Sequence, residues 1–256
     1  KSAVRIFIFT RAGIYYFAGN KRIVRVLFII IFSMMWEYSF PQADKYTSAR
    51  NEMVEYQISD RGITNSEILK AMRKVPRHLF VPKEYTNDAY GDYPLPIGYG
   101  QTISQPYIVA YMTEVVKPNK KKKALEIGTG SGYQAAVLAE IVDTVYTIDI
   151  VPELAAESEA RLKKMGYSNI IVKAGDGYNG WTGHSPFDII IVTAAAEEIP
   201  RPLLDQLAEN GRLVIPVGQA GAVQDLILLV KKNGKIEKKQ LTVVRFVPFK
   251  RSKNQL

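Results

Sequence analysis

Three glycines and an acid give this sequence its clearest chemical signal. The segment LEIGTGSGYQ places Gly128, Gly130 and Gly132 between a short apolar strand and a helical pattern. Glycine lets the backbone turn sharply there and approach a ligand closely. Asp149 ends the next predicted strand, where a carboxylate can accept hydrogen bonds from ribose hydroxyls. The third glycine comes one residue earlier than in the dinucleotide fingerprint, and we expect a nucleotide-containing cofactor at this loop.

Two further acids accompany the loop. Asp176 ends the third predicted strand in AGDGY, a position suited to the adenine edge of such a cofactor. Glu126 lies inside the first strand, where a buried carboxylate is costly unless it is paired. We expect Glu126 to accept hydrogen bonds from the glycine-loop amides, with a purely structural role as an equal alternative. Each acid alone could be an ordinary carboxylate, but the whole set favours a binding site.

An irregular, hydroxyl-bearing segment precedes the glycine loop. PLPIGYGQTISQPYIVAYMTE starts at Pro94 and settles into a helical pattern near Gln105. Thr102 and Ser104 either contact a ligand or cap that helix. No His or Lys in the local motif would activate Ser104 as a nucleophile, so we expect it to donate a hydrogen bond rather than to attack.

Strand and helix patterns alternate through the C-terminal half of the chain. Helical patterns lie at residues 133–141, 152–166 and 201–209. Apolar runs predict strands at residues 123–127, 144–150, 169–173, 187–193, 211–218, 225–232 and 238–249. This alternation predicts an α/β fold with a doubly wound seven-stranded sheet. Asn233-Gly234 separates the last two strands compactly, which predicts an antiparallel hairpin.

Two helical patterns come before this core. One runs over residues 48–62, and the second starts in a capping sequence, Thr64-Asn65-Ser66-Glu67, and continues to about residue 74. We expect them to form an N-terminal helical cap on a single domain. The predicted parts are the domain at 46–250, its helical cap and substrate/cofactor loop at 46–115, and its core at 120–250.

Several blocks of the sequence resemble the protein-L-isoaspartate (D-aspartate) O-methyltransferase family. The segment from Pro94 resembles the signature of that family, and LEIGTGSGYQAAVLAE, GDGYNGW, PFDIIIVTAA, GRLVIPVG and VRFVPF follow in the family's order. GQTISQP is specific, whereas GTGSGYQ occurs in many nucleotide-binding sequences. The resemblance covers roughly residues 50–250. It implies the Rossmann-like fold of S-adenosylmethionine-dependent methyltransferases, with the cofactor outside the carboxyl ends of the first and fourth strands.

The resemblance also implies an activity and a substrate. The enzyme would transfer a methyl group from S-adenosyl-L-methionine to the free α-carboxylate of an L-isoaspartyl residue in a damaged protein or peptide. The ester then collapses without enzyme to a succinimide, which hydrolyses partly to aspartate. A carboxylate with a pKa of about 4 is already ionised at neutral pH, so the task needs no general base and no metal. It is mainly positioning.

Roles for single residues follow from the motifs and the resemblance together. Ser104 is the catalytic candidate, because it would hydrogen-bond the acceptor carboxylate. Gly100 and the stretch Val243-Val244-Arg245-Phe246 would border the substrate with it, although backbone geometry is an alternative role for Gly100. In this family the last two strands are transposed relative to most methyltransferases, which moves that stretch toward the site. The expected cofactor-binding residues are Thr102, Ile103, Glu126, Gly128, Thr129, Gly130, Asp149, Ile150, Asp176, Gly177 and Thr193.

Two other functions stay open. The first is an S-adenosylmethionine-dependent methyltransferase of small molecules or nucleic acids. Adenine and cytosine N-methyltransferases usually carry Asn/Asp-Pro-Pro-aromatic at the fourth strand, whereas this chain reads VTAAAEEIP there. The second is a non-catalytic nucleotide-binding module, which would bind cofactor without turnover. The early third glycine and the lack of a catalytic His or Tyr-Lys arrangement disfavour an NAD-dependent dehydrogenase.

The amino-acid composition and the net charge limit the metals and macromolecules that this chain could bind. The chain has no cysteine and only two histidines, which excludes disulfides, thiolate sites and a His-rich metal site. Six basic residues and no acid lie in residues 1–36, so the net charge of +9 leaves +3 for the rest. The lysine run at 120–123 is expected to be a solvated loop, with an anionic partner as the alternative. We expect isoaspartyl proteins and peptides as partners, neither nucleic acid nor metal, and a monomer.

The first 45 residues are treated as a leader outside the fold. Within KRIVRVLFIIIFSMMW the uncharged run has 11 residues, whereas a membrane-spanning helix needs about 20. The segment does fit the basic and apolar regions of an export signal, although 20 residues precede it and the chain starts with Lys rather than Met. We expect a cytoplasmic enzyme, with export or membrane anchoring by residues 21–43 as the alternative.

Overall fold

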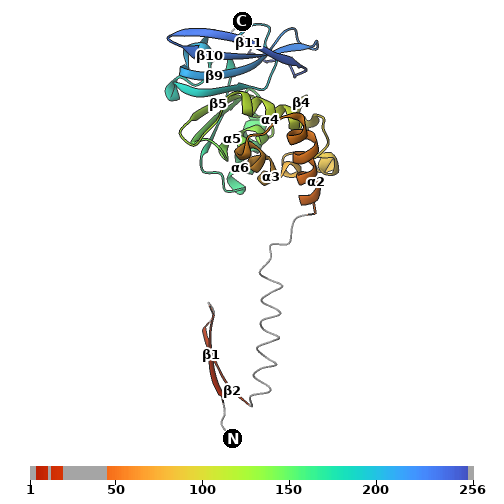
Figure 1. Cartoon of the computed structure of the whole chain (residues 1–256), viewed down its shortest axis with the longest axis vertical. Coiled ribbons are helices and arrows are strands. Elements are labelled where there is room, and N and C mark those ends of the chain that lie inside the picture. The colour runs from red at the N-terminus through yellow and green to blue at the C-terminus, as the bar shows by residue number, and fades with distance from the viewer. Residues whose placement is uncertain (1–3, 11–12, 20–44, 253–256) are drawn as a thin grey trace. The chain divides into compact units, whose positions relative to one another are not determined.

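The structure is a computed structural model that describes residues 4–10, 13–19 and 45–252. The chain divides into two compact units, Lys1–Lys45 and Tyr46–Leu256. In the first unit, β1 (Val4–Thr10) pairs with β2 (Gly13–Gly19) in an antiparallel hairpin (Figure 1). The sequence predicts no secondary structure for this leader, so the hairpin was not expected.

The candidate signal segment, residues 21–43, lies outside the described residues. Its role as a leader, signal or anchor therefore stays a prediction. Among the segments that the structure does describe, no helix has both the length and the apolar character needed to cross a membrane.

In the second unit, the helical cap consists of two helical stretches, as predicted. Gly62 ends the first stretch at a φ of +93°. The second stretch begins after Asn65, whose side chain accepts hydrogen bonds from the backbone N–H groups of Glu67 and Ile68. The N-cap is thus Asn65 rather than Thr64, the first residue of the predicted capping sequence. The elements are α2 (Thr47–Glu52), η1 (Met53–Ile58), η2 (Ser59–Arg61) and α3 (Ser66–Lys74).

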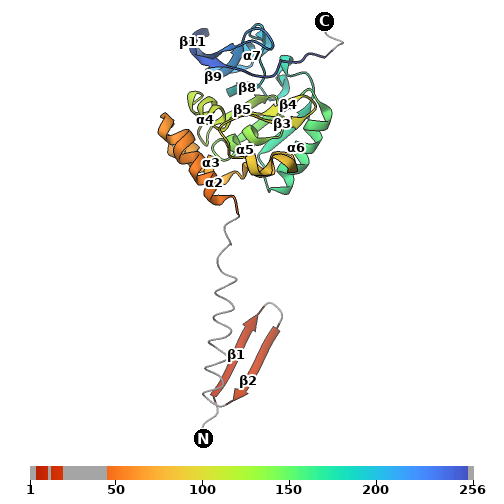
Figure 2. The same cartoon turned by 90° about the vertical axis from the view of Figure 1, so that its right-hand side faces the viewer.

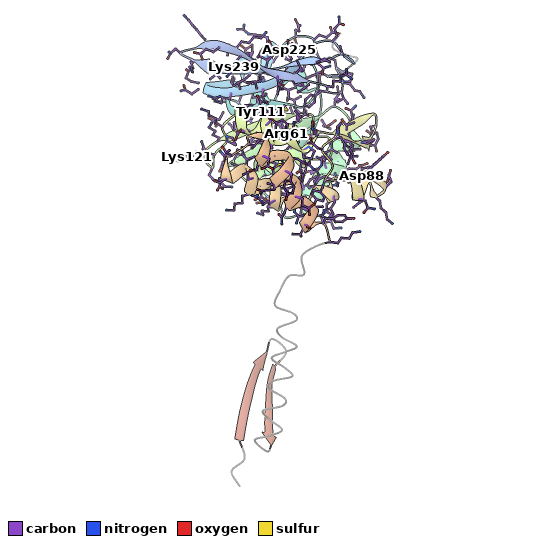
Figure 3. The ribbon with its side chains drawn as sticks, turned by 45° about the vertical axis from the view of Figure 1, so that its right-hand side comes forward. Arg61, Asp88, Tyr111, Lys121, Asp225 and Lys239 are labelled. Carbon is purple, nitrogen blue, oxygen red and sulfur yellow. The ribbon has the colours of Figure 1, made fainter. Side chains whose placement is uncertain are left out.

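The segment between cap and core contains a short hairpin and one helix. Arg61 ties the cap to that helix, because its guanidinium lies 3.6 Å from the ring centroid of Tyr107, which stacks on Tyr111 (Figure 3). Such a contact between a cation and an aromatic face contributes about 0.5–1 kcal/mol at an exposed site. The elements are η3 (Arg77–Leu79), η4 (Lys83–Asp88), β3 (Leu95–Gly98), β4 (Gln101–Ile103) and α4 (Pro106–Val115).

The core is a seven-stranded sheet in the order β11-β10-β9-β8-β5-β6-β7 (Figures 1 and 2). The strands are β5 (Lys123–Ile127), β6 (Thr144–Asp149), β7 (Ile170–Ala174), β8 (Phe187–Val192), β9 (Leu207–Val217), β10 (Gln224–Lys232) and β11 (Lys235–Val244). β5 to β9 pair in parallel, and β10 is antiparallel to both of its neighbours. β5 lies between β6 and β8, so the strand order reverses beside the glycine loop. Ligands of such sheets bind at that point.

Packing on both faces explains why the strands are continuous apolar runs. In β8, Ile189 and Ile191 face one buried cluster while Ile190 and Val192 face another. A parallel strand buried on both faces needs no polar alternation. The helices between the strands are α5 (Tyr133–Ala139), α6 (Pro152–Lys164) and α7 (Arg201–Asp205).

The ends of three predicted elements differ from the sequence expectation by three or more residues, and one of them is β9, which begins at Leu207 rather than at residue 211. The helix predicted at 201–209 ends at Asp205, because Leu207 is fully buried and already pairs with Phe187 of β8. The last predicted strand, 238–249, instead covers Lys235–Val244, and the chain then leaves the sheet. The predicted hairpin is confirmed, and it places β11 at the edge of the sheet.

Candidate active site

The glycine loop is fixed by the carboxylate that follows the next strand. Gly128, Gly130 and Gly132 all have positive φ, at +97°, +51° and +86°. The Gly130 N–H donates to one oxygen of Asp149 over 2.6 Å, and the Val151 N–H donates to the other over 2.9 Å. Asp149 therefore connects the loop after β5 to the start of α6. Burial raises the pKa of Asp149, although these two backbone hydrogen bonds oppose the rise.

A cavity opens beside this loop at the carboxyl ends of β5, β6 and β8. Many of the predicted cofactor residues line it: Thr102, Gly128, Gly130, Asp149, Ile150, Gly177 and Thr193. Space requires glycine at two of these positions, and at Gly128 the φ of +97° requires it as well. A Cβ on Gly128 would collide with Oγ1 of Thr193, and one on Gly177 would collide with Cγ2 of Ile127. The lining is thus shaped for a ligand that lies against bare backbone.

Glu126 is fully buried beside a second, smaller cavity behind the loop. One of its oxygens accepts a hydrogen bond of 2.5 Å from the Thr147 hydroxyl, which also lies 2.7 Å from the Thr129 hydroxyl. The other oxygen has no hydrogen-bond partner among the described residues. Burial raises the pKa of Glu126 to about 8, against the hydrogen bond from Thr147 and together with the charge of Asp149. A bound ammonium group would supply the missing partner.

The predicted hydrogen bonds from the glycine-loop amides to Glu126 are wrong in this structure. The Gly128 N–H donates to the Ile148 carbonyl over 2.8 Å, and the Gly130 N–H donates to Asp149. Ile148 and Asp149 of the neighbouring strand β6 accept these two hydrogen bonds, and Glu126 accepts its hydrogen bond from the Thr147 hydroxyl. A role of Glu126 in cofactor binding therefore depends on its unpaired oxygen.

Ser104 lies where the smaller cavity meets an open groove, and it lines both. Its neighbour Thr102 lines these two and the main cofactor cavity as well, whereas Ile103 lines only the smaller one. The alternative role of Thr102 and Ser104 as helix caps is not found. The N-cap of α4 is Gln105, and no side chain caps this helix end. Within the described part of the chain the Ser104 hydroxyl makes no hydrogen bond, so it is available to a ligand.

The open groove, of about 660 Å³, brings the end of β11 to the start of α4. All four residues of the predicted stretch, Val243, Val244, Arg245 and Phe246, line it with Ser104, and their contact with a substrate stays a prediction. Val243 is 60% exposed, which leaves it free to contact a ligand. β11 thus supplies one wall of the groove and the segment before α4 supplies the other.

Two predicted residues do not line these cavities. Gly100 has a φ of +70°, and no atom lies within 4 Å of a Cβ added there, which fits its alternative role in backbone geometry. Asp176 sits beneath Gly177, and its carboxylate accepts from the backbone N–H of Tyr178 and from Arg251 and Ser252. A contact of Asp176 with adenine stays a prediction.

Sequence reasoning missed the four residues that follow Phe246. Val247, Pro248, Phe249 and Lys250 line the cofactor cavity. The only signal for them in the sequence was the block VRFVPF, which was interpreted as a strand. Gln101 was also missed, although it lies beside the predicted Thr102.

A family model for protein-L-isoaspartate(D-aspartate) O-methyltransferase matches residues 48–254. The chain belongs to this family. A protein-L-isoaspartate O-methyltransferase of Opitutus terrae is 56% identical over 207 residues, which are 81% of this chain and 89% of that protein. Both the family and the methyltransferase class predicted from the sequence are confirmed.

Solved structures of the same family agree with the fold. One protein-L-isoaspartate O-methyltransferase has a TM-score of 0.72 and 29% identity, and the match covers 77% of this chain and 65% of that one, slightly less than two thirds of its length. A Plasmodium falciparum protein described as a protein-L-isoaspartate O-methyltransferase, in complex with S-adenosyl-L-homocysteine, has a TM-score of 0.68 and 29% identity. That match covers 79% of this chain and 99% of the other. The predicted seven-stranded methyltransferase fold is confirmed.

Proposed function

We infer that this chain is a protein-L-isoaspartate O-methyltransferase (EC 2.1.1.77) that uses S-adenosyl-L-methionine. The observation that carries the inference is the position of Ser104. Its unpartnered hydroxyl lies between the cavity shaped for a cofactor and the open groove, within the segment GQTISQP. A group that must touch both the methyl donor and the acceptor belongs at that junction.

The cofactor side fits S-adenosyl-L-methionine in three respects. The glycine loop leaves room for a ligand against the backbone, Asp149 lines the cavity where ribose hydroxyls would lie, and the unpaired oxygen of Glu126 suits an ammonium group. When bound, the cofactor supplies an electrophilic methyl group on a sulfonium sulfur. The related Plasmodium falciparum protein binds the product form of this cofactor, S-adenosyl-L-homocysteine.

The acceptor side needs to position a carboxylate and to exclude water. Ser104 donates a hydrogen bond to one oxygen of the α-carboxylate of the isoaspartyl residue and thereby fixes the other oxygen toward the methyl group. Val243 and Val244 cover the acceptor from the β11 side. Holding two reactants in line can lower a barrier by about 7–11 kcal/mol. Since the carboxylate is already ionised at neutral pH, the site needs no base.

Methylation of isoaspartyl proteins would start their repair, because the methyl ester closes to a succinimide that opens partly to aspartate. Damaged proteins and peptides are therefore the proposed partners, and the open groove suits a peptide chain. We propose that the enzyme is a monomer and that it acts in the cytoplasm. Both S-adenosyl-L-methionine and damaged protein substrates are supplied there.

The test uses two synthetic peptides that differ only in L-isoaspartate or L-aspartate at one site. We expect base-labile transfer of labelled methyl groups to the isoaspartyl peptide alone. The Ser104→Ala variant should lose about 100-fold in kcat, as for the loss of one hydrogen-bond donor at a reacting group. Calorimetry with S-adenosyl-L-homocysteine should give the same affinity for both proteins. Label on neither peptide, with cofactor binding intact, would rule out the isoaspartyl assignment.

A further inference from the structure

The chain crosses the cofactor cavity after it leaves β11. We call residues 247–252 the C-terminal strap; its first four residues line the cavity. Figure 2 shows this part of the chain, in dark blue, running on from the sheet toward the C-terminus. The strap therefore forms part of the cavity wall, together with the strand ends.

A backbone anchor holds the first half of the strap. The Ala195 N–H donates to the carbonyl of Val247 over 2.9 Å, and the Phe249 N–H donates to the carbonyl of Ala195 over 2.8 Å. Ala195 lies three residues after the end of β8 and is buried, so this anchor joins the strap to the carboxyl end of a central strand. It fixes the strap up to Phe249 and leaves the rest to a second anchor.

The second anchor is made by side chains. Nε of Arg251 donates to Oδ2 of Asp176 over 3.0 Å, and the Ser252 N–H donates to the same oxygen over 3.1 Å. The guanidinium also lies 3.6 Å from the ring centroid of Tyr178. The Asp176 side chain is only 6% exposed and that of Arg251 only 26%, so solvent screens this pair less than a surface pair.

The charge state of Asp176 agrees with this role. Burial by itself raises the pKa of its carboxyl, but the N–H groups of Tyr178 and Ser252 and the Arg251 guanidinium outweigh it and hold the pKa below its ordinary value. Asp176 thus stays ionised at neutral pH and keeps its attraction for Arg251.

We propose that Arg251 is a positioning residue for cofactor retention, because its pair with Asp176 latches the C-terminal strap over the cofactor cavity. The inference rests on the proposed function only in taking S-adenosyl-L-methionine as the ligand of that cavity. With the latch closed, the strap completes the cavity wall. Breaking the latch lowers the closed fraction, and the apparent affinity for the ligand falls by the same factor.

The experiment compares Arg251→Ala with Arg251→Lys and with Arg201→Ala. Arg201 forms an ion pair of the same 3.0 Å length with Asp205 on an exposed surface, so its removal is the matched control. S-adenosyl-L-homocysteine binding is followed by calorimetry and its release by stopped-flow displacement. We expect Arg251→Ala to bind about tenfold more weakly, the effect of losing roughly one charge-assisted hydrogen bond, and to release the ligand faster. Arg251→Lys should recover part of the loss, and Arg201→Ala should match the wild type.

Steady-state kinetics separate a latch from a general loss of structure. In Arg251→Ala, KM for S-adenosyl-L-methionine should rise while KM for the isoaspartyl peptide and kcat stay near the wild-type values. In an Asp176→Asn background, where the pair is already weakened, Arg251→Ala should add little further loss of affinity. An unchanged or higher affinity in Arg251→Ala, or full additivity of the two changes, would overturn the latch.

The binding measurements contain no peptide, so they stand apart from the isoaspartyl assignment. If neither peptide is methylated but Arg251→Ala still releases S-adenosyl-L-homocysteine faster, the latch holds and only the substrate assignment fails. If both peptides behave as proposed but release is unchanged, the substrate assignment holds and the latch is wrong.

Discussion

On the cofactor side of the site the polar groups are largely committed to the fold, whereas on the acceptor side they are left open. Both oxygens of Asp149 accept backbone N–H groups, and the Thr193 hydroxyl lies within 2.8 Å of the Gly128 carbonyl. Ser104 and Arg245 line the groove and make no hydrogen bond or ion pair within the described residues. The glycine-loop wall of the cofactor side is thus held in place before any ligand binds, and the acceptor side gains its partners from the substrate.

If the cofactor side is rigid, adding one methyl group there should have the largest effect. Gly128→Ala places a Cβ against Oγ1 of Thr193 at a φ of +97°. Because the Thr193 hydroxyl is held by the carbonyls of Ile127 and Gly128, moving it aside disturbs the loop, and we expect S-adenosyl-L-homocysteine affinity to fall by about 100-fold or more, which corresponds to about 2.8 kcal/mol. Calorimetry measures the affinity, and circular dichroism checks that the variant is folded.

Gly62→Ala is the matched control for this change. Gly62 has almost the same φ, +93°, but nothing lies within 4 Å of its added Cβ. Both variants should lose about 1–2 kcal/mol of stability from the left-handed conformation. Equal losses of cofactor affinity in the two variants would mean that backbone strain, and not the rigid wall, limits binding.

Sequence reasoning found the rigid side more completely than the open side. Gly128, Gly130 and Asp149 are linked by local rules, since a loop after one strand meets the end of the next strand in any doubly wound sheet. The sheet itself followed from apolar runs that are buried on both faces. These features depend on residues that are close in sequence or lie on the next strand. The alternation of apolar strand and helix patterns in the sequence predicts both.

What sequence reasoning missed depends on contacts between distant segments. Arg251 meets Asp176 across 75 positions of the chain, and no local pattern around either residue announces the other. The partner of Glu126 was mispredicted for a similar reason. The loop amides were taken up by Ile148 and Asp149 on the adjacent strand, a choice set by strand register. The end of α7 was likewise decided by the burial of Leu207 in β9.

Glu126 is the exception on the cofactor side, because one of its oxygens has no hydrogen-bond partner within the part of the chain that the structure describes. Its pKa of about 8 lies above the ordinary 4.5, so the free protein holds a proton on Glu126 at pH 7. Pairing with the cofactor ammonium favours the ionised form, and binding should therefore release up to about one proton at pH 7. In Glu126→Gln we expect this release to vanish and affinity at pH 8 to fall about tenfold.

Calorimetry at pH 7 in buffers of different ionisation enthalpy measures the proton release. Subtracting the proton release of Glu126→Gln from that of the wild type removes the protons that come from the ligand's own amine.

The stability of the free protein gives an independent check. Because the folded-state pKa is raised, the contribution of Glu126 to stability is present below pH 4.5 and is lost as pH rises through about 8. Glu126→Gln should remove that decline; an unchanged pH profile would contradict a buried, protonated Glu126.

The smallest expected effect lies on the open side, at Arg245. Among the described residues that line the groove it is the one charged side chain, and the α-carboxylate of an isoaspartyl residue is an anion. Its attraction should help to capture the substrate without entering the methyl transfer, which Ser104 aligns. Since exposed pairs contribute about 0.2–1 kcal/mol, Arg245→Gln should raise the peptide KM about two- to fivefold and leave kcat unchanged. The KM difference should shrink at 0.5 M salt, where the screening length is about 4 Å.

Lys239→Gln separates local attraction from net charge. Lys239 is an exposed residue of β11 that does not line the groove, and its removal lowers the net charge by the same amount (Figure 3). Its KM should match the wild type. If both variants raise KM equally, the groove contributes no local attraction and the acceptor side is held by Ser104 and the apolar walls alone. If Arg245→Gln lowers kcat instead, Arg245 takes part in aligning the carboxylate, and the acceptor side is less open than its unpaired groups suggest.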